Sequence, residues 1–100
     1  MNRSSKVIGN YNYIINNVVI NYQANAVEGL VTIVKGNRTF SAPCNLVYQF
    51  DDIYRIYISE FKVSIFVEVH WDHNNTVTSM KVLNVIDARK QVLTKFDLSK

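Results

Sequence analysis

Phe61-Lys-Val-Ser-Ile-Phe-Val-Glu-Val-His-Trp71 is the stretch of sequence that decides the fold. Six apolar residues stand at every second position, which is the period of a strand that buries one face. A helix, with 3.6 residues per turn, would scatter these residues around its axis. The stretch therefore predicts a β-strand over residues 61–71.

The residues that follow predict an antiparallel partner for this strand. A turn at Asn74-Asn75 pairs residues 61–71 with residues 76–85 and sets Glu68 opposite Lys81. Opposite charges that face each other across two strands are favourable. The same register pairs Val69 with Met80, Val67 with Val82 and, on the outer face, Phe66 with Leu83.

Two further hairpins are predicted nearer the N-terminus. The first runs from Tyr11 to Ala24 around Asn16-Asn17, with one apolar face and one face rich in amides. The second runs from Leu30 to Ala42 and turns at Gly36-Asn37, where glycine suits a type II′ turn. We expect Pro43 to end that strand, because it has no amide hydrogen to donate. These registers pair Ile15 with Val18, Tyr13 with Ile20, Tyr11 with Tyr22, Ile33 with Phe40 and Val31 with Ala42.

The middle of the chain predicts two more strands, 45–50 and 53–58, separated by Asp51-Asp52. The apolar residues of 53–58 have the opposite parity to those of 61–71. Such a phase change needs a turn or a bulge, which we place at Ser59-Glu60. The alternative is one long bent strand over residues 53–71.

The C-terminal segment allows two interpretations. Val85, Ala88, Val92 and Phe96 recur at helical spacing, with Asn84 as a helix cap. Val92, Thr94 and Phe96 also alternate like a strand after a turn at residues 87–90, and we favour the strand. The fold is thus expected to be all-β, with or without one C-terminal helix. It would be a small antiparallel β-sandwich or barrel of about seven or eight short strands, forming a single domain over 1–100 in which residues 1–6 are a frayed tail.

Composition agrees with a β fold. The chain has 14 Val, 10 Ile and 12 aromatic residues against 4 Ala and 5 Leu, and branched and aromatic side chains favour strands. The net charge of +3 comes entirely from residues 1–50, where four basic residues meet one acidic residue. Residues 51–100 carry seven of each. The basic balance excludes an acidic mimic of DNA.

The expected location is the cytoplasm. With one cysteine, Cys44, the chain cannot form an internal disulfide. No apolar run resembles a leader or a membrane span, so we expect no membrane partner. Twelve Asn with few Ala and Gly indicate an AT-rich coding sequence, as in a low-GC bacterium, a phage or other virus, or a mobile element.

Three groups of residues resemble chemical sites. His70 and His73 with Asp72 could bind a metal, but the ligand set is incomplete. Cys44 with a histidine could form a thiol–imidazole catalytic pair, but the sequence shows no third group to orient the histidine and no oxyanion site. Asp51-Asp52, with Glu60 nearby, is more typical of a turn than of an acid–base pair. We therefore expect no catalytic residue, no metal and no cofactor.

Two groups suggest contacts instead. Ile53, Arg55 and Tyr57 should face outward, and Phe66 and Leu83 lie on the outer side of their hairpin. Exposed arginine and aromatic residues are typical of interface hot spots. Lys35 and Arg38 face each other at a hairpin tip, where they could contact an anion.

These observations predict a protein that is not an enzyme and binds another protein or itself, with homodimerisation as one form. A small inhibitor, an immunity-type protein or an assembly subunit would fit. The alternative is a single-stranded nucleic-acid-binding β-barrel, in which outward aromatics stack on bases. Its platforms would be Tyr11, Tyr13, Tyr22, Tyr57 and Phe66.

The alternation in residues 61–71 makes a direct test of the register possible. Val67→Asp should unfold the protein, because it places an unpaired charge in the core. Thermal unfolding followed by circular dichroism measures the effect. An unchanged melting temperature would mean that the register is off by one residue.

Overall fold

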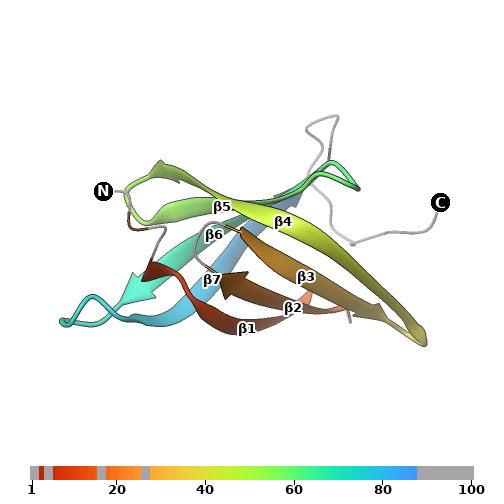
Figure 1. Cartoon of the computed structure of the whole chain (residues 1–100), viewed down its shortest axis with the longest axis horizontal. Coiled ribbons are helices and arrows are strands. Elements are labelled where there is room, and N and C mark those ends of the chain that lie inside the picture. Colours follow the sequence, from red (N-terminus) through yellow and green to blue (C-terminus); the bar gives the residue numbers. More distant parts are fainter. Residues whose placement is uncertain (1–2, 4–5, 16–17, 26–27, 88–100) are drawn as a thin grey trace.

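One seven-stranded antiparallel sheet makes up the fold. The computed structural model describes residues 3, 6–15, 18–25 and 28–87. The strands are β1 (Gly9–Ile15), β2 (Val18–Asn25), β3 (Glu28–Lys35), β4 (Arg38–Phe50), β5 (Ile53–Ile58), β6 (Val63–Trp71) and β7 (Val77–Ile86). Each strand pairs with its sequence neighbour, and the sheet curls into a nearly closed barrel (Figure 1). No α-helix occurs in the described residues, so the all-β prediction is confirmed.

The core fills the inside of the barrel. Six of the residues that alternation predicts to face inward are buried, with at most 5% of their surface exposed: Ile33, Ile56, Val63, Ile65, Val67 and Val69. Tyr13, Tyr22 and Tyr54 join them, together with Val7 from the segment before β1. The interior is therefore packed with branched and aromatic side chains.

The two N-terminal hairpins have the predicted registers. Tyr13 pairs with Ile20 and Tyr11 with Tyr22, while Ile33 pairs with Phe40. Gly36 has a φ of 62°, as the first central residue of a type II′ turn requires. Asn16 and Asn17, where we placed the first turn, lie outside the described residues.

Pro43 does not end its strand, so this prediction was wrong. β4 continues through Pro43 to Phe50, and Pro43 pairs with Leu30. In an antiparallel hairpin, hydrogen-bonded pairs alternate with pairs that are not hydrogen-bonded. The Lys35–Arg38 pair next to the two-residue turn is hydrogen-bonded, so five pairs further on the Leu30–Pro43 pair is not. The proline nitrogen therefore points away from β3 and toward the β5 side of the strand. Pairing with β5 begins only at Asn45, so β5 has no residue opposite Pro43. No ladder hydrogen bond is lost.

The phase change between β5 and β6 occurs in a turn over residues 59–62, and the alternative of one long strand is wrong. Phe61 belongs to this turn and not to the strand, because β6 begins at Val63. Lys62 has a φ of 53°, a left-handed conformation that ends the extended chain. The half-buried Phe61 ring still packs against the core.

β7 carries two irregularities that the sequence did not predict. Val69–Met80, Val67–Val82 and Glu68–Lys81 pair as expected, but Phe66 pairs with Asn84, so the predicted Phe66–Leu83 pair is wrong. Leu83 is an extra residue at a bulge, and Thr78 is a second one. Because of this second bulge the strand begins at Val77 and not at residue 76.

Only the start of the C-terminal segment is described. Asn84, Val85 and Ile86 belong to β7, so Asn84 is not a helix cap. The choice between helix and strand for residues 88–96 lies outside the described residues.

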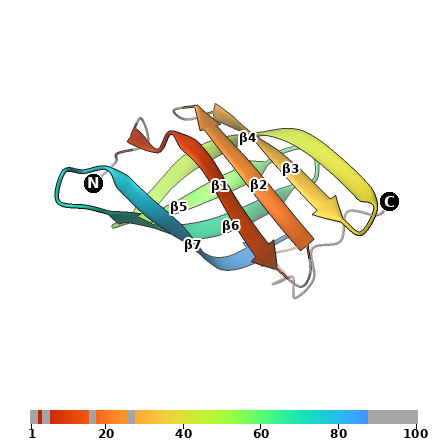
Figure 2. The same ribbon diagram turned by 90° about the horizontal axis from the view of Figure 1, so that it is seen from below.

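The two edge strands meet at a seam. β1 and β7 lie side by side in Figures 1 and 2, and the Tyr13 hydroxyl donates to the Met80 sulfur at 3.0 Å. Both are odd-numbered strands of one antiparallel meander and therefore run parallel to each other. The barrel is closed at this seam by side chains and not by a registered ladder.

Outside the barrel, strands β1–β4 present three cross-strand rows of outward residues, which we call the β1–β4 face. The rows are Ile14–Val19–Val34–Thr39, Asn12–Asn21–Thr32–Ser41 and Asn10–Gln23–Leu30–Pro43.

Gly29 makes the closest approach inside the sheet. A Cβ atom at Gly29 would lie 2.6 Å from the Tyr22 ring and 2.6 Å from the Gln23 carbonyl oxygen. Such distances are too short for non-bonded carbon and oxygen atoms. Only glycine therefore lets β3 pass beside the buried Tyr22 ring.

We expect Gly29→Ala to destabilise the fold by roughly 1–3 kcal/mol, because the added methyl group overpacks the core. Urea unfolding measures the loss. Gln23→Ala, an exposed neighbour, is the control and should cost less than about 0.5 kcal/mol. Equal stability of the two variants would show that the sheet accommodates the methyl group.

Candidate functional site

Arg55, Tyr57 and Phe66 come together on the outer face of β5 and β6. Arg55 pairs with Phe66, and Tyr57 pairs with Ser64. Strict alternation sends the side chains of all four residues outward. They line a hollow of about 390 Å³ together with Lys62, Ile86 and Asp87. We call this the Arg55 hollow.

Arg55 is the least satisfied residue of this hollow. Its guanidinium carbon lies 5.2 Å from the centre of the Tyr57 ring, within the range of a cation–π contact. Its Nε atom is buried and has no hydrogen-bond partner. Within the described part of the chain, Arg55 forms no ion pair. A buried N–H without an acceptor is costly. A partner's carboxylate or carbonyl group would relieve this cost if the side chain shifts enough to bring Nε to the surface.

The hollow contains only part of the predicted set. Ile53 pairs with Glu68, and Leu83 is the extra residue of a β7 bulge; neither lines the hollow. Lys62 and Ile86 do line it, and neither was predicted to belong to a site. Lys62 could have been found from its place in the turn before β6. The position of Ile86 depends on the bulge at Leu83, which was not predicted from the sequence although the apolar parity changes between Val82 and Val85.

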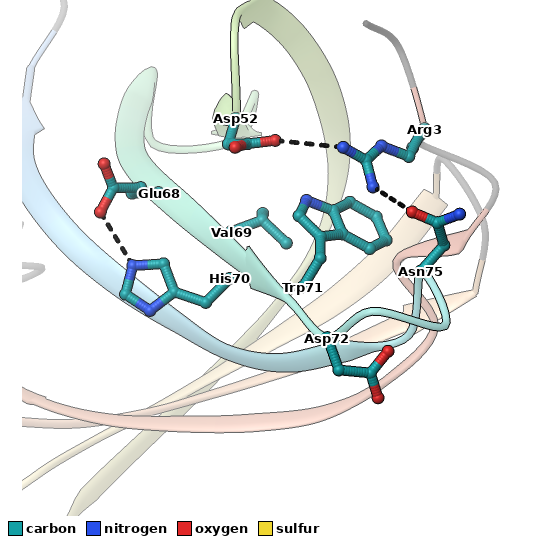
Figure 3. Close-up of a pocket in the computed structure, with 8 residues that line it drawn as sticks. All are labelled: Arg3, Asp52, Glu68, Val69, His70, Trp71, Asp72 and Asn75. Carbon is teal, nitrogen blue, oxygen red and sulfur yellow. Dashed lines mark hydrogen bonds and ion pairs between the residues drawn. The ribbon is translucent and has the colours of Figure 1, made fainter.

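A second hollow, of about 460 Å³, lies at the other end of β6 (Figure 3). Arg3 crosses it, with its guanidinium carbon 4.3 Å from the centre of the Trp71 ring. The same side chain lies 3.6 Å from Asp52 and donates to the Asn75 side-chain oxygen at 2.9 Å. Its backbone N–H donates to the Tyr54 hydroxyl. Although Arg3 falls in the segment expected to fray, these contacts attach it to the barrel end.

His70 has partners other than a metal ion. Glu68 lies 2.8 Å from Nε2 of His70, and the Ser79 hydroxyl lies 3.2 Å from Nδ1. The Asp72 carboxylate accepts hydrogen bonds from the backbone N–H groups of Asn74 and Thr76, and so builds the turn. Among residues 3, 6–15, 18–25 and 28–87, no three His, Cys, Asp or Glu residues are placed to hold a metal ion.

The acidic pair forms a turn, and the basic pair flanks another one. Asp51 has a φ of 49° in the β4–β5 turn, where Asp52 contacts Arg3. Lys35 and Arg38 face each other at the β3–β4 turn, as predicted. Neither Lys35 nor Arg38 lines either hollow, whereas Asp52 lines the second one.

Cys44 is enclosed by the core, with 4% of its surface exposed. Desolvation raises the pKa of its thiol to about 12. Since the thiolate is the nucleophilic form, this cysteine is poorly suited to covalent catalysis.

Comparison with known proteins gives no relative: no family model, no curated protein and no solved structure matches the chain. In the portion that the structure describes, no helix has the length and apolar character needed to cross a membrane.

Buried ionisable groups predict a loss of stability in alkali. Burial raises the pKa values of Cys44, Tyr13 and Tyr22 above their ordinary values of 9.0 and 10.0. The unfolded chain therefore loses these protons first. The stabilisation is complete below about pH 9 and is lost as the pH rises toward the folded-state pKa values.

Urea unfolding at several pH values between about 8 and 11 tests this expectation. Cys44→Ala should delay the onset of the loss to the ionisation range of the tyrosines. A free energy of unfolding that stays constant over this range would contradict it.

Proposed function

We propose that this protein is a non-enzymatic protein-binding domain and that the Arg55 hollow is its contact surface. One observation carries the proposal: Arg55 is half-buried, stacked on Tyr57 and without an acceptor for its Nε atom. An inhibitor, an immunity-type protein and an assembly subunit are the forms that fit this size. Its one cysteine suits a reducing compartment, for which we propose the cytoplasm.

The charge of the hollow indicates the chemistry of the partner. Arg55 and Lys62 both line it, and neither forms an ion pair within the described residues. A carboxylate side chain of the partner would accept from the guanidinium fork, and such charge-assisted hydrogen bonds are about twice as strong as neutral ones. Asp87, at the rim, would disfavour a highly charged anion.

The aromatic residues indicate how binding energy would be concentrated. Tyr57 and Phe66 flank Arg55, and tyrosine and arginine are enriched among the residues that dominate interfaces. Their positions are set by the hydrogen-bonded ladder between β5 and β6. Little ordering of these two rings would therefore be needed on binding.

Single-stranded nucleic acid is the second candidate for this hollow. Two cations beside two aromatic rings could hold a phosphate and a stacked base. Tyr13 and Tyr22 are buried, however, and the partly buried Tyr11 packs against the core. Only Tyr57 and Phe66, two of the five predicted platforms, line the hollow, which is why a protein partner is preferred.

The test is the double variant Arg55→Ala with Tyr57→Ala. Hot-spot residues cost roughly 2–4 kcal/mol each when truncated, so we expect at least about a hundredfold weaker binding to the partner. Affinity capture from the native host, followed by mass spectrometry, identifies that partner. Calorimetric titration then measures the affinity.

Arg38→Ala with Phe50→Ala is the matched control, since it removes an exposed arginine and an exposed aromatic residue elsewhere. It should bind as the parent does. If the Arg55–Tyr57 variant binds the partner as tightly as the parent does, the contact lies on another surface. If that variant instead unfolds, these residues contribute to the stability of the sheet.

A gel shift with single-stranded nucleic acid at two salt concentrations tests the alternative function, because nucleic-acid binding weakens as the salt concentration rises.

A further inference from the structure

The β1–β4 face differs from the rest of the surface in its lack of charge. None of its twelve outward residues is ionisable, although 19% of the chain is charged. The nearest outward charge on these strands is Glu28, one row beyond Leu30. Lys35 and Arg38 belong to the inward-facing row that ends at the hairpin tip. The face is therefore an uncharged sheet surface on a chain of net charge +3.

Exposed apolar side chains gather on this same face. The described residues include seven large hydrophobic side chains that are exposed, and four of them are Ile14, Val19, Leu30 and Val34. Three of the four form one continuous row across β1, β2 and β3. Ile14 is 76% exposed, Val19 40% and Val34 37%. Such a row is suited to burial against another surface.

The polar residues of the face can complement copies of themselves. Asn21 donates to Asn12 at 2.8 Å, and the hydroxyls of Thr32 and Ser41 lie 3.1 Å apart. Amides and hydroxyls both donate and accept hydrogen bonds, whereas a charge repels its own copy. In a two-fold contact the same patch meets itself. A face of amides, hydroxyls and apolar groups satisfies that requirement.

The edges of the sheet support the same assignment. β7 carries two bulges and Lys81, which are devices that keep an edge strand from pairing with another chain. β1 (Gly9–Ile15) has no charge and no proline, and all seven of its residues pair regularly with β2. The edge strand next to the uncharged face thus lacks the bulges and charge that the β7 edge carries.

We propose that the β1–β4 face is a self-association surface whose occupant is a second copy of this chain, related by a two-fold axis. Because the chain is positively charged, two copies repel each other over the Debye length of about 8–10 Å. Contact through the uncharged face keeps the charged residues apart and buries the Ile14–Val19–Val34 row. This interface is separate from the Arg55 hollow and leaves that hollow open to a partner.

The experiment compares the full-length parent with Ile14→Lys by sedimentation equilibrium from about 1 µM to about 1 mM, a range that covers weak and moderate dimers. We expect a parent dimer and at least a hundredfold weaker association for Ile14→Lys, since the two-fold axis places two added charges in one interface. At a concentration where both proteins are monomeric, the 76% exposure of Ile14 predicts the same melting temperature for the variant and the parent. Loss of association at higher concentration then cannot be ascribed to unfolding.

Phe50→Lys is the control, because Phe50 is 63% exposed and lies outside the face. It should dimerise as the parent does. Asn12→Lys is a second variant in the middle row and should behave like Ile14→Lys. A parent that remains monomeric at the highest concentration overturns the proposal, as does an Ile14→Lys variant that dimerises with parental affinity. Neither result bears on the Arg55 hollow, which is tested by its own double variant.

Discussion

The whole barrel depends on one constraint: along every strand, alternate side chains must point into the same core. The constraint is strict because a one-residue slip exchanges the buried and exposed faces of a strand. β6 meets it without interruption, from Val63 to Val69. Wherever the apolar parity of the sequence changes, the backbone has an irregularity that absorbs the extra residue.

The bulge at Leu83 shows how such an irregularity also shapes the surface. With Val67 opposite Val82, an unbroken ladder would set Val85 opposite Ser64, on the outside of the barrel. The extra residue moves Val85 opposite the buried Ile65 and brings Ile86 opposite Ser64. One inserted residue thus returns a valine to the core and completes the apolar wall of the Arg55 hollow. The surface feature is a consequence of core packing.

Much of this fold can be predicted from the sequence, because alternation and turn chemistry act over short distances. Two hairpin registers and the Gly36 turn were predicted correctly. In the third hairpin only the central pairs, such as Glu68–Lys81, were correct. Pro43 was misjudged because its effect depends on where β5 begins to pair, which is a tertiary property. In the Arg55 hollow, parity alone placed Arg55, Tyr57 and Phe66. Ile86 required knowledge of the bulge, and Lys62 required the conformation of the turn.

The sequence-ordered sheet has a consequence for how the chain folds. Every ladder joins consecutive strands, so each pairing closes only a short loop, and the entropy of loop closure grows with loop length. The contacts that join distant parts of the chain are few, such as Tyr13 with Met80 and Arg3 with Asn75. Contact order correlates inversely with folding rate. Zipping one hairpin onto the next, with the seam closing last, would make this barrel a fast folder for an all-β protein.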